Sequence, residues 1–169
     1  MTGELNRVLL ITPKADFLKE TMYAPPLGPL YLAAVLEAAG HEVRFLDLNR
    51  RPLQPEDLTG VSHVGISATT PVYPAAVETL KEIKQYGTQQ LSQVVRTIIG
   101  GPHATARGSE VLKDGWDTVC VGEGEDVITE IVEKRQAGTI HGGWVKNLDT
   151  VPYPARHLIT QNDYHRGKE

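Results

Sequence analysis

The 169-residue chain has room for one domain of ordinary size, and its composition, 40% hydrophobic and 22% charged, is that of a globular protein. A formal net charge of −4 argues against a duplex nucleic-acid binder, which would normally carry a basic face. There is no apolar run of the roughly 18 residues that a membrane span needs, and no signal-peptide stretch precedes the first predicted strand. Cys120, the one cysteine, excludes an internal disulfide and any iron–sulfur or zinc site built from several cysteines of this chain. We therefore expect a cytoplasmic protein with no nucleic-acid partner and no membrane span.

Short apolar runs alternate along the chain with segments of helical spacing. Continuous runs of this kind are typical of strands that are buried on both faces of a parallel sheet. They predict five strands, over residues 7–12, 43–48, 64–69, 94–99 and 118–121. Apolar spacing and glycine stop signals predict helices that begin at Pro25-Pro26 and span 74–86 and 126–136, with short helices over 55–58 and 110–113. The apolar face of the first helix is expected to comprise Leu27, Leu30, Tyr31, Ala34, Val35 and Ala38.

Alternation of strands and helices implies right-handed crossovers and a parallel sheet. We predict a doubly wound α/β domain over residues 5–138, with five strands in the flavodoxin-like, Rossmann-like order 2-1-3-4-5. The pattern stops at Thr139. Residues 139–169 are expected to form an exit arm or linker toward a further domain, stiffened by Pro152 and Pro154.

Ligands of open parallel sheets bind outside the carboxyl ends of the strands. Here the segments after the third, fourth and fifth predicted strands are Ser67-Ala-Thr-Thr70, Gly100-Gly-Pro-His103 and Gly122-Glu-Gly124. Glycines let a bulky ligand approach the backbone, and hydroxyl groups donate or accept hydrogen bonds without charge. This edge suits a large, polar-edged, nearly neutral ligand better than a small anion.

Several of these residues also have purely local explanations. Gly100-Gly101 is compatible with a tight turn, His103 with a hydrogen-bonding turn residue, and Cys120 with a buried, inert thiol. Gly122-x-Gly124 lacks the third glycine of a dinucleotide fingerprint. A nucleotide- or flavin-binding α/β domain and a flavodoxin-like protein-interaction domain therefore stay open as alternatives. A phosphoacceptor domain is disfavoured, since threonines stand where it would need acidic residues.

Five motifs of the chain, taken in order, carry a family resemblance. They are Pro25-Pro-Leu-Gly-Pro-Leu-Tyr31, Val64-Gly-Ile-Ser-Ala-Thr-Thr70, Ile99-Gly-Gly-Pro-His-Ala-Thr105, Val121-Gly-Glu-Gly-Glu125 and Leu148-Asp-Thr-Val-Pro-Tyr-Pro-Ala-Arg156. The set resembles the N-terminal cobalamin (vitamin B12)-binding domain of cobalamin-dependent radical SAM enzymes. That family includes methyltransferases and the anaerobic magnesium-protoporphyrin IX monomethyl ester oxidative cyclase. The resemblance covers residues 6–158.

The resemblance implies that the corrin lies across the carboxyl ends of the strands and that its nucleotide tail enters the crevice between sheet and helices. It implies cofactor contacts from Ser67, Thr69, Thr70, Gly100, Gly101, Pro102, His103, Gly122, Glu123 and Gly124. It places Pro26, Leu27 and Gly28 near the lower face of the corrin.

Two departures from related cobalamin proteins limit the expected chemistry. The loop after Thr12 has no Asp-x-His-x-x-Gly motif, so we expect no histidine–cobalt bond from it and assign no metal-binding residue. The Cys-x-x-x-Cys-x-x-Cys motif of the radical domain is absent, so S-adenosylmethionine and a 4Fe–4S cluster are expected only in a missing C-terminal radical SAM domain. We assign no catalytic residue and expect no catalysis from this chain alone. The intact enzyme is expected to be a methyltransferase or an oxidative cyclase.

Overall fold

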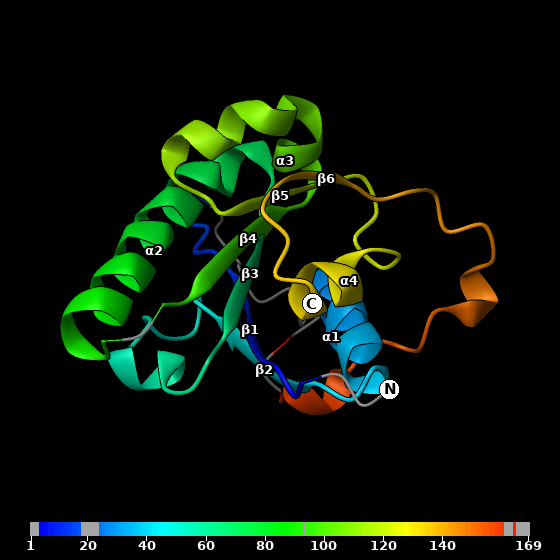
Figure 1. Ribbon diagram of the computed structural model, residues 1–169, viewed down its shortest axis with the longest axis horizontal. Helices are drawn as coiled ribbons and strands as arrows, with labels where there is room; N and C mark the ends of the chain where they lie inside the picture. Colours follow the sequence, from blue (N-terminus) through cyan, green and yellow to red (C-terminus); the bar gives the residue numbers. More distant parts are fainter. Residues whose placement is uncertain (1–3, 18–23, 93, 161–163, 165–169) are drawn as a thin grey trace, which may run out of the picture.

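The computed structural model describes residues 4–17, 24–92, 94–160 and 164. Its centre is a six-stranded parallel sheet in the order β2-β1-β3-β4-β5-β6 (Figure 1). The strands are β1 (Arg7–Thr12), β2 (Glu42–Asp47), β3 (His63–Ser67), β4 (Arg96–Gly100), β5 (Thr118–Val121) and β6 (Gly138–His141). The predicted parallel α/β class and the order of the first five strands are confirmed.

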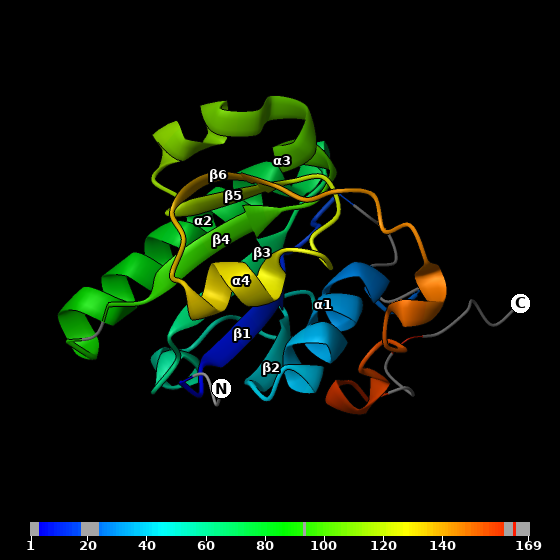
Figure 2. The ribbon, with the colours of Figure 1, turned by 45° about the vertical axis from the view of Figure 1, so that its right-hand side comes forward.

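Helices cover both faces of the sheet. They are α1 (Leu27–Ala38), α2 (Tyr73–Gln85), α3 (Pro102–Arg107) and α4 (Ile128–Glu133). Helices α1 and α4 lie together on one face, and α2 and α3 lie on the other (Figures 1 and 2). Because side chains alternate along a strand, Leu10 of β1 packs toward α1 and α4 while Leu9 and Ile11 pack toward α2. The sheet is therefore buried on both sides, as continuous apolar runs predict.

The prediction of five strands is wrong by one. Strand β6 pairs in parallel with β5 from Thr118↔Gly138 to Val121↔His141. It spans four residues at the edge of the sheet and contains a single large apolar residue, Ile140. So short an edge strand shows neither a continuous apolar run nor a clear alternation. The predicted boundary at residues 138/139 consequently cuts through the sheet, and Thr139 to His141 belong to the domain rather than to an arm.

Two helical details also differ from the prediction. Helix α3 was not predicted, because its six residues follow Gly101 directly and are too few for a periodic signal. In α1 the buried residues are Pro29, Leu30, Ala33, Ala34 and Leu36. Leu27 is 41% exposed and Ala38 is exposed, so the predicted face is only partly right. A helix this apolar all round does not reveal its buried face by spacing alone.

The segment that follows β6 returns to the domain. Figure 2 shows it passing beside α1. The Ala155 N–H donates to the Leu30 carbonyl at 2.9 Å, and Ala155 is buried. Further along, His157 Nε2 lies 2.9 Å from Glu37 Oε1. None of the described helices combines the length and apolarity that crossing a membrane requires.

Candidate functional site

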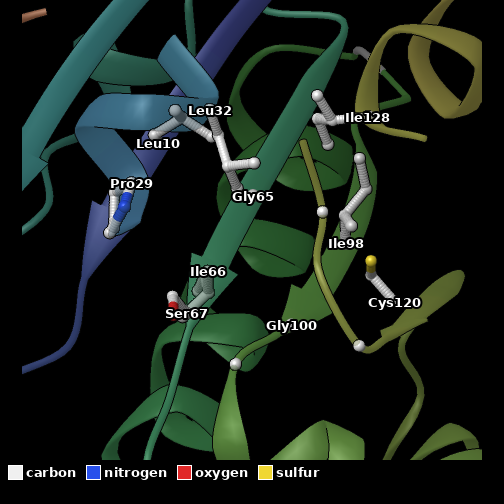
Figure 3. A pocket seen from close by; sticks show the side chains of 13 residues that line it. Leu10, Pro29, Leu32, Gly65, Ile66, Ser67, Ile98, Gly100, Cys120 and Ile128 are labelled. Atoms are coloured by element: carbon white, nitrogen blue, oxygen red, sulfur yellow. The ribbon is translucent and has the colours of Figure 1, made fainter. Parts of the chain in front are cut away.

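A narrow crevice with a cavity volume of about 60 Å³ lies between the sheet and helices α1 and α4 (Figure 3). Its walls come from β1, β3, β4 and β5, from the two helices, and from the turns that follow the strands. The lining residues are Leu10, Pro29, Leu32, Gly65, Ile66, Ser67, Ile98, Gly100, Gly101, Cys120, Gly122, Gly124 and Ile128. The mouth is at the carboxyl edge, because Ser67 and Gly101 are half-buried and Gly122 is exposed while the deeper residues are buried.

Two glycines create the crevice. In the strand register, Leu10, Gly65 and Ile98 stand side by side on the face that α1 covers. The Leu10 side chain covers Gly65, because a Cβ on Gly65 would lie only 2.8 Å from Leu10 Cδ2, so only glycine fits there. One step toward the carboxyl end, Gly100 pairs with Ser67 and again leaves the sheet bare. Because side chains alternate along a strand, Gly65 and Gly100 leave two positions on one face without a side chain of their own, and both line the crevice.

The walls of the crevice are largely apolar. Leu10, Leu32, Ile98 and Ile128 contribute aliphatic side chains. Cys120 is buried, and burial, reinforced by the charge of Glu125, raises the pKa of its thiol to about 11. The thiol is therefore neutral at ordinary pH, which confirms the expectation of a buried cysteine. Such a lining accommodates a flat apolar group and offers nothing to balance a charge.

Gly101 shapes the mouth for a reason that the sequence did not reveal. It has φ +88, and a Cβ there would lie 2.7 Å from Ser67 Oγ and 3.0 Å from the backbone N and O of Ala68. The turn after β4 therefore runs directly against the end of β3. Room for a ligand was the expected role of Gly101, but close approach of two backbones requires glycine there independently.

The predicted residues on the far side of the carboxyl edge form a separate group. The His103 ring stacks on Tyr73 with 3.9 Å between centroids, and its Nδ1 lies 3.1 Å from Thr70 Oγ1. The Tyr73 hydroxyl donates to Asp114 at 2.5 Å and accepts from Trp116 Nε1 at 3.2 Å. Burial and the neighbouring Asp114 raise the pKa of Tyr73 to about 12. With exposed Thr69 and Pro102, these residues line the edge outside the crevice.

Glu123 holds the chain where it leaves the sheet. Its Oε2 accepts a hydrogen bond from the Val145 N–H at 2.5 Å. Beside it, a Cβ on Gly122 would lie 2.7 Å from the Gly142 carbonyl oxygen, so the turns after β5 and β6 are in backbone contact. Glu123 thus has a structural partner within the chain. Gly142 was missed because the sequence after Gly138 was expected to form an arm.

The start of α1 lies next to the crevice, but Pro26, Leu27 and Gly28 are not among its lining residues. Their neighbours Pro29 and Leu32 line it instead. The deep wall of Leu10, Gly65, Ile98 and Cys120 was also missed. One signal for it was present in the sequence, because a glycine inside a strand marks a close approach of backbone or ligand.

The histidines that the structure describes do not line the crevice. His41 and His63 are buried at the amino-terminal end of the sheet, and His103 is held by Thr70 and Tyr73. Within the ranges that the structure describes, no group of three or more His, Cys, Asp or Glu side chains is arranged to hold a metal ion.

The fold is that of an α/β domain with a crevice at the carboxyl edge of its parallel sheet. The model of the B12 binding domain family matches residues 14–132, and this chain belongs to that family. The resemblance to a cobalamin-binding domain found in the sequence is thereby confirmed.

Two further similarities were found. Over 150 residues the chain is 29% identical to cytidylyl-2-hydroxyethylphosphonate methyltransferase of Streptomyces wedmorensis, with 73% of this chain covered. The chain spans about a quarter of that protein, since 27% of the methyltransferase is covered. A solved N-terminal domain of a hypothetical protein of Thermotoga maritima is 23% identical, with a TM-score of 0.47 over 75% of this chain and 95% of that one.

Proposed function

We propose that this B12-binding domain holds cobalamin with the nucleotide tail in the crevice beneath α1 and the corrin over the carboxyl ends of the strands. The observation that carries the proposal is the crevice itself. Gly65 and Gly100 contribute no side chain to it, and it is apolar along its depth, which suits the flat base of the tail. Ser67, Gly101 and Gly122 at its mouth would meet the polar part of the tail.

The edge outside the crevice would hold the corrin side arms. Thr69 and Thr70 are exposed there, and Pro102 and His103 start α3 beside them. Leu27 and Gly28 at the start of α1 would face the lower side of the ring. These positions offer uncharged hydroxyl, backbone and apolar surfaces, which match the amide arms and the apolar edge of a corrin.

Cobalt would receive no imidazole from this chain. The loop between β1 and α1 contains no histidine, and His103 lies in the separate group with Thr70 and Tyr73, outside the crevice. When bound, cobalamin supplies a cobalt that carries a methyl group or tunes a radical step. The chain's own residues bind and orient it.

The chain would serve as the cobalamin-binding part of a larger, cytoplasmic, cobalamin-dependent radical SAM enzyme. S-adenosylmethionine and a 4Fe–4S cluster would belong to a further domain, because Cys120 is the one cysteine here. Its similarity to a methyltransferase, of which it spans about a quarter, favours methyl transfer over ring formation.

A comparison of hydroxocobalamin with cobinamide, which lacks the nucleotide tail, tests the placement of the tail. The purified chain is mixed with each, desalted, and measured by visible absorption. We expect cobalamin to be retained with the spectrum of cobalt that has no histidine ligand, and cobinamide to be lost. Gly100→Val should abolish retention by filling the crevice, while Ala38→Val, at an exposed position near the far end of α1 and outside the crevice, serves as the control. Equal retention of cobinamide, or a folded but colourless chain, would overturn the proposal.

A further inference from the structure

The hydrogen-bonding side chains of the crevice are few and unevenly placed. Ser67 lies at the carboxyl end of β3, where the crevice opens. Cys120 lies on the deep wall and is 5% exposed. A thiol is a weak donor and a weak acceptor. Beyond the mouth, therefore, the side chains offer no strong hydrogen bond to a ligand (Figure 3).

Several backbone groups of the crevice glycines are hydrogen-bonded within the chain. Gly65 lies inside the sheet, paired with β1 and β4. The Gly100 carbonyl accepts from the Ala68 N–H at 3.1 Å, and the Gly101 carbonyl accepts from the Thr105 N–H at 3.0 Å. The Gly122 N–H donates to Thr105 Oγ1 at 3.0 Å. These bonds stabilise the turns at the mouth, and none of them lies on the deep wall formed by Leu10, Ile98 and Ile128.

We infer that the crevice selects cobamides by the chemistry of the lower base, accepting an apolar benzimidazole or phenolic base and rejecting adenine. The inference rests on the proposed placement of the nucleotide tail. Adenine carries an exocyclic amine and ring nitrogens that are hydrogen-bonded in water and would lose those partners between Leu10, Ile98 and Ile128. Dimethylbenzimidazole presents two methyl groups and the edge of a benzene ring instead, and phenolic bases present a benzene ring.

The cost of burying unpaired polar groups sets the size of the effect. Each buried donor or acceptor left without a partner weakens binding substantially, so we expect at least about a tenfold preference for the apolar base. A base that coordinates cobalt must first be displaced before it can enter the crevice, and this displacement costs free energy. If only one of two compared bases coordinates cobalt, that cost would obscure the preference. The comparison therefore needs two bases that both stand free of cobalt.

The test compares p-cresolylcobamide, whose phenolic base has no nitrogen to bind cobalt, with pseudocobalamin, whose base is adenine. Dissociation constants are measured by visible absorption and corrected for the fraction of pseudocobalamin with its base free. Cobinamide is the third ligand. Binding of p-cresolylcobamide at least about tenfold tighter than pseudocobalamin supports the inference. Equal binding of the two, or tighter binding of pseudocobalamin, overturns the inference. If both still bind more tightly than cobinamide, the proposed function stands. Binding of cobinamide as tight as that of p-cresolylcobamide overturns the placement of the tail itself.

A pair of variants places the selectivity in the crevice. Cys120→Ser puts a full donor and acceptor on the deep wall and should narrow the preference severalfold, whereas Cys120→Ala should leave it intact. If Cys120→Ser keeps the same preference for p-cresolylcobamide over pseudocobalamin, the deep wall does not determine which base is bound. The comparison on the unsubstituted chain decides the inference even where a variant fails to fold.

Discussion

The two adjacent glycines at the end of β4 are predicted to separate folding from ligand binding. Gly101→Ala should destabilise the domain. A residue other than glycine in a strained backbone region costs about 1–3 kcal/mol, and Gly101 has φ +88. The added Cβ would also lie 2.7 Å from Ser67 Oγ and 3.0 Å from the Ala68 backbone, and overpacking of this kind costs about 1–3 kcal/mol more. We expect the free energy of unfolding to fall by about 3 kcal/mol or more.

Gly100→Ala should have the opposite profile. Its Cβ would lie 3.7 Å from Cys120 Cβ, an ordinary contact, and Gly100 is not among the glycines with positive φ. Replacement of glycine by alanine at a compatible position stabilises by about 0.4–1 kcal/mol. The same methyl group enters the crevice, so cobalamin binding should weaken although the fold gains stability.

Urea unfolding and cobalamin binding, measured on both variants, check this reasoning. With a urea dependence of about 1–3 kcal/mol per molar, a loss of 3 kcal/mol lowers the midpoint by about 1–3 M. Gly28→Ala is the control for unfolding, since nothing lies within 4 Å of its Cβ and alanine favours the helix. The control for binding is Ala38→Val, at an exposed position outside the crevice. If Gly101→Ala unfolds at the midpoint of the unsubstituted chain, the backbone argument is refuted. If Gly100→Ala binds cobalamin as tightly as the unsubstituted chain, the crevice does not hold the ligand.

Three further predictions concern other parts of the domain. Burial, with the charges of nearby arginines, lowers the pKa of His63 to about 4. The unfolded chain takes up this proton below about pH 6.5 and the folded chain only near pH 4. The free energy of unfolding should therefore fall by about 3 kcal/mol as the pH is lowered from 6.5 to 4. In His63→Leu the slope of unfolding free energy against pH should decrease between pH 6.5 and 4; an unchanged slope assigns the loss to other groups. His103→Ala should weaken cobalamin binding a fewfold and leave the absorption spectrum of the bound form unchanged; a spectral change of axial ligation contradicts this. Glu123→Ala removes the acceptor for the Val145 N–H and should accelerate chymotryptic cleavage at exposed Trp144, while Glu123→Gln, which keeps an acceptor, restores resistance; equal cleavage of all three chains would rule out the anchoring role.

Strands in the centre of the sheet could be predicted because a strand that is buried on both faces has a continuous run of apolar residues. The Arg7–Thr12 and Thr118–Val121 strands agree with the predicted residues, since each is a continuous apolar run. Strand β6 lies at an edge, where one side is solvated and the apolar signal is weak. Just beyond its pairing with β5, Gly142 approaches Gly122, a contact between segments that local sequence does not encode.

The candidate site could likewise be predicted in part. Glycines and hydroxyl groups at strand ends stand out in sequence, and Ser67, Gly100, Gly101, Gly122 and Gly124 do line the crevice. The depth of the crevice depends on register, because only the pairing of β1, β3 and β4 places Gly65 between Leu10 and Ile98. Which residues face the same side of a sheet is known only once its order and register are known.

The arrangement of Gly65 and Gly100 links stability to binding. A glycine inside a strand costs about 0.5–1 kcal/mol relative to alanine, and a bare sheet face forgoes packing against the helix above it. Leu32 and Ile128 therefore face a gap that the chain's own side chains do not fill. A ligand in the crevice supplies the missing contacts and stabilises the folded state by about 2.7 kcal/mol at a concentration of one hundred times its dissociation constant. A side chain that fills the crevice supplies the missing packing contacts and occupies the space of the ligand. In Gly100→Ala the stability of the ligand-free chain should therefore rise while its affinity for the ligand falls.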